Sequence, residues 1–216
     1  MIAAMAIFPL VFLVQPTVAA VVLPRESASN LTEGHLLLYL LGIPVLTPAI
    51  LAAYAVAGER QQGSLEPMLS TPISRQELLV GKALAAAVPS ILLAYAAFAL
   101  FMGVLVAFAK PEIASALLRP SDVAAQFIFT PLLATGAVWI AVAVSTRTSD
   151  GRTAQQLSLL LSLPLVLGPA LVAFDVIHPT LRLAVIAGAL LLVADIWGWR
   201  LVGPLLDRER LITGSG

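Results

Sequence analysis

Few residues in this sequence could do chemistry, and the most suggestive pair is an incomplete nucleotide-binding loop. Gly81-Lys82 resembles the end of such a loop, which needs a glycine five residues before the second glycine and Ser or Thr directly after the lysine. Gln76 and Ala83 occupy these two positions. No complete loop of this kind occurs elsewhere in the sequence. We therefore expect ATP, if the protein uses it, to be bound by another chain.

Histidines and membrane-buried carboxylates are the remaining candidates. His35 and His178 have no metal-ligand or protease spacing, and the absence of cysteine removes thiolate catalysis and Cys-based metal sites. Asp175 and Asp195 lie near or within apolar stretches, where a carboxylate is costly and so marks a candidate functional residue. The position of Asp175 beside His178 favours solvated pairing at a membrane edge. Asp195 is deeper, and it is a candidate for a transport path or for an ion pair with Arg200. The sequence thus predicts no catalytic residue, metal site or cofactor in this chain.

The composition predicts a membrane protein. Of 216 residues, 60% are hydrophobic and 11% are charged, whereas about a quarter of an average soluble domain is charged. The formal net charge is zero, so no nucleic-acid partner is expected. Solid apolar runs of about 20 residues favour membrane-spanning helices over the alternating strands of a barrel. We predict an all-α polytopic membrane protein, a single transmembrane domain over 1–216, with six transmembrane helices at 2–23, 36–57, 83–109, 123–145, 157–174 and 183–202.

Basic residues orient these spans, because cytoplasmic loops carry an excess of Lys and Arg. The second and fourth connections, the C-terminal tail and the end of the last span contain eight basic residues: Arg60, Arg75, Lys82, Arg147, Arg152, Arg200, Arg208 and Arg210. The opposite side has four: Arg25, Lys110, Arg119 and Arg182. This asymmetry predicts a multi-pass protein of the cell membrane with both termini in the cytoplasm. It also places in the cytoplasm the long polar interval at about 58–82 and a second loop at about 146–155.

The polar interval contains several helix start and stop signals. Gly63 can end the incoming helix, and Ser64 suits the N-cap of a short new helix that ends before Pro72. Leu65, Met68 and Leu69 have the i, i+3, i+4 spacing of one helix face. A capping box formed by Ser74 and Glu77 then begins the third span. The apolar face of the short helix has two candidate partners, the bilayer surface or another protein, and the interleaved acidic residues favour a protein.

This interval resembles the cytoplasmic loop of type-2 ABC transporter permeases. The resemblance is carried by Glu59-Arg60, Gly63-Ser64-Leu65-Glu66, Leu69, Thr71-Pro72-Ile73-Ser74-Arg75, Glu77-Leu78 and Gly81-Lys82. In that family the loop forms a coupling helix that docks on a separate ATPase subunit. The resemblance therefore implies that the partner-binding residues are Glu59, Arg60, Gly63, Ser64, Leu65, Glu66, Met68, Leu69, Thr71, Pro72 and Arg75. The family usually begins with a basic amphipathic helix, whereas apolar residues follow Met1 directly here.

The resemblance implies an ABC exporter permease subunit, paired with a second permease copy and with ATPase subunits. Two alternatives stay open. A secondary transporter would have internal repeats with broken helices at matching positions. A membrane enzyme acting on lipid-linked substrates would need clustered carboxylates, histidines or a serine nucleophile, which the sequence does not offer. The substrate class is not readable from the sequence.

Overall fold

The described part of the chain is entirely helical. The computed structural model describes residues 13, 14, 16–18, 20–22, 36–54, 57–62, 74–117, 120–174, 176–178 and 180–202. Within these residues no strand occurs. The helices are α3 (Leu36–Ala53), α4 (Ala57–Gln61), α6 (Arg75–Phe108), α7 (Pro111–Leu117), α8 (Pro120–Arg147), α9 (Gly151–Ala173) and α10 (Leu181–Val202). The all-α prediction is confirmed for these ranges.

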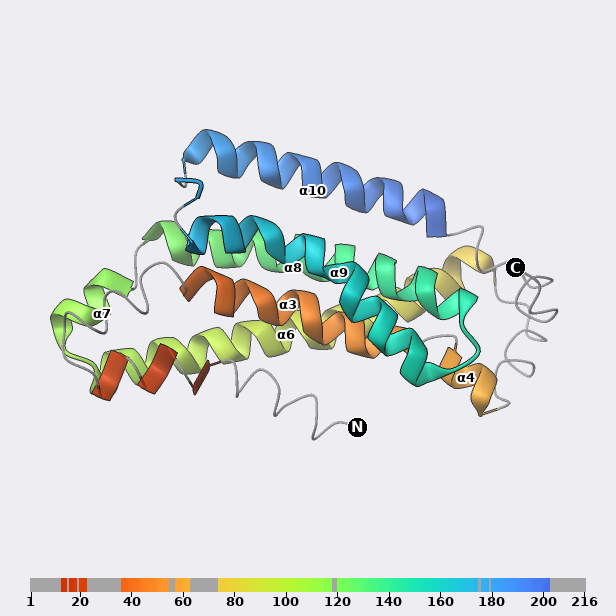
Figure 1. The fold of residues 1–216 in the computed structure, drawn as a ribbon, viewed down its shortest axis with the longest axis horizontal. Helices are drawn as coiled ribbons and strands as arrows, with labels where there is room; N and C mark the ends of the chain where they lie inside the picture. The colour runs from red at the N-terminus through yellow and green to blue at the C-terminus, as the bar shows by residue number, and fades with distance from the viewer. Residues whose placement is uncertain are drawn as a thin grey trace.

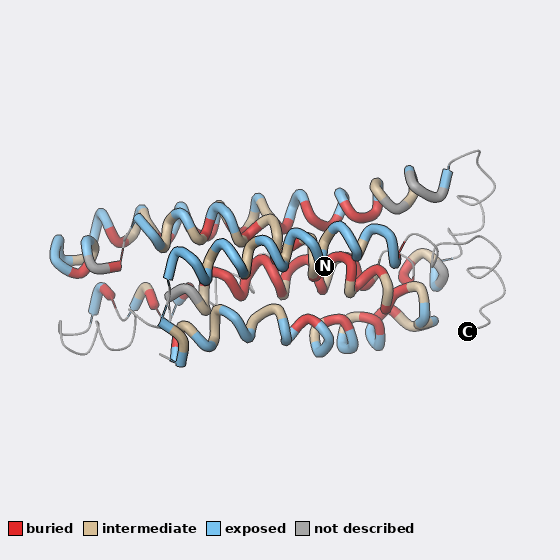
Figure 2. Tube along the Cα trace, turned by 90° about the horizontal axis from the view of Figure 1, so that it is seen from above, coloured by how far each residue is buried: buried red, intermediate tan, exposed pale blue. Residues whose placement is uncertain are grey.

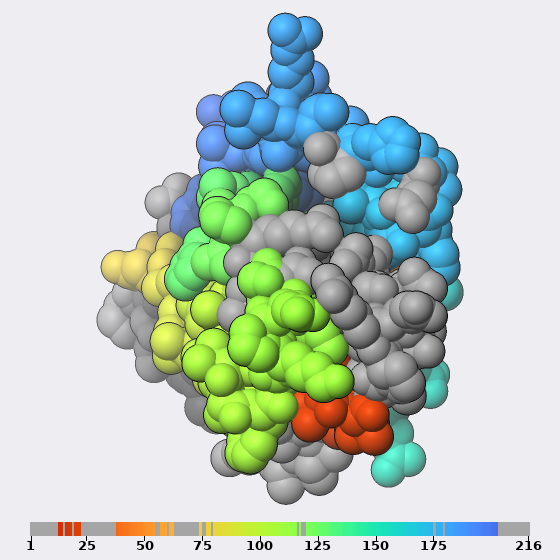
Figure 3. Space-filling view, turned by 90° about the vertical axis from the view of Figure 1, so that its left-hand side faces the viewer, coloured from red at the N-terminus to blue at the C-terminus, as the bar shows by residue number. Residues whose placement is uncertain are grey.

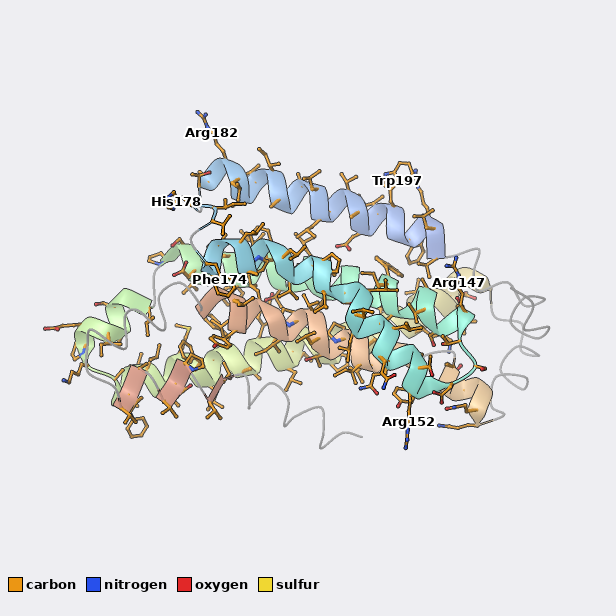
Figure 4. The ribbon with its side chains drawn as sticks, viewed as in Figure 1. Arg147, Arg152, Phe174, His178, Arg182 and Trp197 are labelled. Atoms are coloured by element: carbon orange, nitrogen blue, oxygen red, sulfur yellow. The ribbon has the colours of Figure 1, made fainter. Side chains whose placement is uncertain are left out.

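The long helices lie side by side along one axis (Figure 1). One end of this bundle, the α4 end, contains α4, the starts of α6 and α9, and the ends of α8 and α10. At the opposite end, the α7 end, α7 lies over part of the bundle, and the start of α10 projects from the upper edge of this face (Figure 3). Arg147 and Arg152 lie at the α4 end, and His178 and Arg182 at the α7 end (Figure 4). The two predicted sides of the membrane thus correspond to the two ends of the bundle.

Among the described residues, five helices are long and apolar enough to cross a membrane. The candidate spans are Leu38–Glu59, Val80–Phe108, Pro120–Arg147, Gly151–Ala173 and Leu181–Val202. Large apolar side chains on their outer faces are exposed, including Leu92, Val106 and Leu190, as expected of a surface that meets lipid. Most of the first apolar block, 2–23, lies outside the described residues, so the count of six spans stays a prediction.

Helix boundaries agree with the sequence prediction at the start of the third span and differ elsewhere. The α6 helix begins at Arg75, directly after Ser74, where the capping box predicts the start of this span, although the apolar block itself begins at Ala83. Its 34 residues make it about 51 Å long, well beyond the hydrocarbon core of about 30 Å, so part of it must project from the membrane. The second span is interrupted after Ala53, before α4. The short helix α7 was not predicted.

The α3 helix occupies the centre of the bundle. It packs against α6, α8 and α9, and most of its described side chains are buried, whereas α10 is buried only at Val202. Figure 2 shows this arrangement, with buried residues inside the bundle and exposed residues along the outer helices. The buried residues of α9 are all small: Gly151, Ala154, Ser158, Ser162 and Ala173. Because membrane helices lack a hydrophobic driving force between them, such small residues favour association by letting backbones approach closely.

A glycine also sets the contact between α8 and α10. A Cβ on Gly198 would lie 2.5 Å from Cδ1 of Trp139, closer than two such atoms can approach. The next residue, Trp199, meets Trp139 edge to face, with ring centroids 5.9 Å apart. The α10 helix packs mainly on α8, and the close approach of Gly198 to the Trp139 ring is one of the contacts that attach it there.

A side chain of a neighbouring helix replaces the backbone N–H that a proline in α8 lacks. Pro131 has no N–H, so the carbonyl of Phe127, four residues earlier, loses its usual helical partner. The hydroxyl of Tyr95 in α6 donates to this carbonyl at 3.1 Å, and the Tyr95 and Phe127 rings lie 5.2 Å apart. The proline in α8 is therefore stabilised by a hydrogen bond from a neighbouring helix.

This arrangement makes a prediction about Tyr95. Tyr95→Phe should lower the free energy of unfolding by about 1–2 kcal/mol, because it leaves a carbonyl in the membrane without a donor. Pro131→Ala restores a backbone N–H for the same carbonyl, so the cost of Tyr95→Phe should nearly vanish when both changes are present. Thermal unfolding of the four variants in detergent measures both effects. An equal cost of Tyr95→Phe with and without Pro131→Ala would contradict this role.

Candidate functional site

The structure describes only the two ends of the polar interval that resembles a coupling loop. Ser74 and α6 form one end, and α4 with Gln62 forms the other. Glu59 and Arg60 lie in α4, and Arg75 is the first residue of α6. The other predicted partner-binding residues lie outside the described residues: Gly63, Ser64, Leu65, Glu66, Met68, Leu69, Thr71 and Pro72. The coupling helix itself therefore stays a prediction. The site that the structure describes is the junction at its base, formed by α4, the start of α6, the end of α8 and the start of α9.

An ion pair joins the two ends of the interval. Nζ of Lys82 in α6 contacts Oε2 of Glu59 in α4. The Lys82 side chain is only 8% exposed, whereas that of Glu59 is 32% exposed. A buried ammonium needs a partner to offset its desolvation, and the carboxylate supplies one. A residue at the start of the interval and a residue at its end are thus held together, and the pair joins α4 to α6.

The break between α3 and α4 is occupied by a serine from another helix. In a continuous helix the N–H of Ala57 would bond the carbonyl of Ala53. Instead, the Ala57 N–H donates to Oγ of Ser145 in α8 at 2.9 Å, and this hydroxyl donates to the Ala53 carbonyl at 2.7 Å. The Ser145 hydroxyl therefore sits within the hydrogen-bond ladder, which is a known cause of helix kinks.

The other side of α4 packs on the start of α9. A Cβ on Gly151 would lie 2.6 Å from Cε1 of Tyr54, so the ring occupies the space that a side chain would need. The Tyr54 hydroxyl donates to Oε1 of Gln155 at 3.4 Å. At the end of α4, Nε2 of Gln61 donates to Oδ1 of Asp150 at 2.8 Å. The α4 helix is therefore attached to α6, α8 and α9.

Side-chain caps begin two of the helices at this junction. Ser74 is the N-cap of α6, and both hydrogen bonds of its capping box with Glu77 are present. Asp150 is the N-cap of α9, and its Oδ2 accepts from the backbone N–H of Thr153 at 2.8 Å. These hydrogen bonds, chiefly with Ser74 and Thr153, lower the pKa of Glu77 and of Asp150. Each cap thus stabilises the fold above the carboxyl's ordinary pKa, and loses this effect as the pH falls through the lowered value.

Asp195 lies against α8 rather than beside Arg200. Its Oδ1 is 3.4 Å from the place that a Cβ on Gly136 would take, and Leu165 of α9 is at a similar distance from that place. In the ranges that the structure describes, Asp195 has no ion pair with Arg200. By helix rise, Asp195 lies about 10 Å from the end of α10 at Val202. Its place on a transport path stays a prediction.

A second polar feature is buried inside α8. Gln126 and Thr130 are one turn apart, and both are fully buried. Within the part of the chain that the structure describes, both amide atoms of Gln126 and the hydroxyl oxygen of Thr130 have no hydrogen-bond partner. Unpartnered polar groups are costly in a bilayer, so this pair is a candidate functional feature of the interior. Among the described residues no group of His, Asp and Glu could hold a metal ion.

Sequence reasoning missed several residues of the junction. Sequence patterns place Lys82 in a motif but indicate no partner for its side chain, and they do not single out Gln61 or Ser145. Their contacts join residues 23, 89 and 92 positions apart in the sequence. The one signal that could have identified Lys82 is its place at the start of an apolar block, since a charged residue there needs a partner or access to water.

The Glu59–Lys82 pair makes an asymmetric prediction. Glu59→Gln removes the charge that faces the more buried partner and should destabilise the chain by about 3 kcal/mol. Lys82→Met leaves behind the better solvated carboxylate and should cost only about 1–2 kcal/mol. Lys110→Met, which changes an exposed lysine just after the same helix, is the matched control and should cost almost nothing. Thermal unfolding in detergent ranks the three variants, and equal stability of all three would contradict a structural role for the pair.

Comparison with known proteins completes the description of the site. No curated protein and no solved structure matches the chain. A family model described as ABC-2 family transporter protein matches residues 1–202, and this range includes every described helix, both ends of the polar interval and the predicted coupling segment between them. The chain therefore belongs to the ABC-2 family of transporter proteins, as its resemblance to type-2 ABC permeases predicted.

Proposed function

We propose that this chain is the transmembrane permease subunit of an ATP-driven exporter, coupled to a separate ATPase subunit that binds ATP. The observation that carries the coupling is the Glu59–Lys82 ion pair at the base of the predicted coupling segment. A segment whose two ends are joined in this way can transmit a displacement to α4 and α6, whereas a flexible loop would absorb it. Membership of the ABC-2 family supports a transport role and an ATPase partner.

The proposed mechanism is mechanical. Two copies of the chain face each other, with two ATPase subunits at their α4 ends. Closure of the ATPases on ATP displaces the segment between α4 and α6. The ion pair passes this displacement to both helices, and the rigid 34-residue α6 carries it across the membrane to a path between the two copies. This chain itself catalyses no covalent step.

The proposal requires the α4 end to face the cytoplasm. The described basic residues Lys82, Arg147, Arg152 and Arg200 lie at or near this end, whereas Lys110 and Arg182 lie at or near the α7 end. Since cytoplasmic loops are enriched in Lys and Arg, this distribution supports the proposed orientation. The secondary-transporter alternative would not need an ATPase at either end.

Orientation can be tested directly, because the chain has no cysteine. Ser149 and His178 are exposed residues in connections at opposite ends of the bundle. In intact cells, His178→Cys should react with a membrane-impermeant maleimide, whereas Ser149→Cys should react only after permeabilisation. Each variant is the control for the other. Labelling of Ser149→Cys from outside would place the α4 end away from any cytoplasmic ATPase and reject the proposal.

Docking of the ATPase can be tested at Leu65, which the residue spacing places on the apolar face of the coupling segment. Leu65→Asp would put an unpaired charge in a desolvated contact. A penalty of about 3 kcal/mol corresponds to a loss of affinity of about a hundredfold. Leu65→Met keeps an apolar side chain and should retain binding. The measurement is the amount of ATPase that co-purifies with each variant at matched membrane abundance.

Equal recovery of the ATPase with both Leu65 variants would show that this face does not dock. The proposal as a whole fails if no ATPase co-purifies with the unmodified chain, or if the purified chain moves its substrate on an ion gradient alone. A complex containing two copies of each subunit is the expected result.

A further inference from the structure

The contacts of α4 extend to a helix that is distant from it in sequence. Ala57 of α4 and Ala154 of α9 belong to one buried cluster, together with Ala53 and Val144. The covalent route from α4 to α9 passes through α6, α7 and α8. A displacement of α4 would therefore reach α9 directly only through side-chain contacts between the two helices.

The packing between Tyr54 and Gly151 leaves little room for independent movement. The Tyr54 ring fills the space over Gly151, and a Cβ at that position would overlap two ring atoms, at 2.6 and 2.9 Å. Close-packed surfaces of this kind transmit displacement, because they have no gap to absorb it. The contact lies at the first residue of α9, where a push acts on the end of the helix.

One carboxylate also connects the end of α4 with the start of α9. Asp150 accepts from Gln61 through Oδ1 and caps α9 through Oδ2, in both cases at 2.8 Å. A displacement of Gln61 is therefore applied to the group that begins α9. On the other side, the Ser145 hydroxyl of α8 lies between the Ala53 carbonyl of α3 and the Ala57 N–H of α4, in place of the helical hydrogen bond between them.

We infer that α4 and the first turns of α9 move as one unit, with Tyr54, Gln61 and Asp150 as positioning residues that pass motion of the coupling segment to the fifth apolar block. This inference rests on the proposed function, because it names a second route for the same ATP-driven displacement. The first route runs through Glu59 and Lys82 to α6. The second bypasses α6 and acts on a helix whose outer face meets lipid.

Distances between nitroxide labels test this route. Three exposed positions serve as labelling sites: Gln62 beside α4, Leu160 in α9 and Val193 in α10. The chain is labelled at two introduced cysteines and mixed with excess unlabelled chain, so that each complex contains one label pair. On addition of ATP and vanadate, the distance between labels at 160 in α9 and 193 in α10 (the 160–193 distance) should change by more than about 2 Å. The distance between labels at 62 beside α4 and 160 in α9 (the 62–160 distance) should stay constant. A change in 62–160, or none in 160–193, would overturn the inference.

Substitutions at Gln61 distinguish a role in passing movement from α4 to α9 from a role in the stability of the fold. Gln61→Glu places a second carboxylate beside Asp150 and should abolish the nucleotide-dependent change in 160–193. Gln61→Lys restores an attractive contact with Asp150 and should recover that change. Both are single changes at an exposed site, so thermal unfolding should be similar for the two variants. Equal nucleotide responses of the two would reject the role of Gln61.

A measurement on the chain alone keeps this inference distinct from the proposed function. In lipid nanodiscs without any ATPase, Gln61→Glu should broaden the 62–160 distance distribution relative to Gln61→Lys. Identical distributions would overturn the α4–α9 unit whether or not an ATPase binds. If no ATPase co-purifies with the chain, the proposed function is rejected. The distance distributions in nanodiscs then still test whether α4 and α9 form one unit.

Discussion

The backbone of a membrane helix has no water to replace a lost hydrogen bond, and this constraint decides where the helices of this protein can be interrupted. Two interruptions illustrate it. At Pro131 only a donor is missing, and the Tyr95 phenol supplies a donor. Between Ala53 and Ala57 both a donor and an acceptor are left over, and the Ser145 hydroxyl bonds to both. In each case a neighbouring helix provides the group that the broken helix requires.

This requirement links the position of one helix to the shape of another. The break after α3 is stable only while α8 holds Ser145 against it, and the proline in α8 has its replacement donor only while α6 keeps Tyr95 in place. Separating these helices would leave polar backbone groups without partners in lipid, at a cost of about 1–3 kcal/mol for each group. The bundle can therefore change shape more readily at its ends, where water can replace such bonds, than along its length.

Sequence reasoning succeeded where the determinants are local. The apolar blocks predicted the five long helices, and the Ser-x-x-Glu pattern marks the start of α6, because a capping box joins residues only three positions apart. It failed where the determinants are tertiary. Nothing near Ser145 indicates that its hydroxyl serves α3, and nothing near Gly198 indicates that Trp139 lies over it.

The junction and the spans are held together by different kinds of contact. Along the membrane, α3 packs on α9, whose buried residues are all small, and the attraction is the sum of many weak dispersion contacts. At the α4 end, two directional contacts are added to the Tyr54–Gly151 packing: the Glu59–Lys82 ion pair and the Gln61–Asp150 hydrogen bond. A directional contact fixes the geometry of two named groups, whereas dispersion between small side chains does not. Such a division suits the proposed function, in which an ATPase acts on the α4 end and the interior rearranges without breaking its backbone hydrogen bonds.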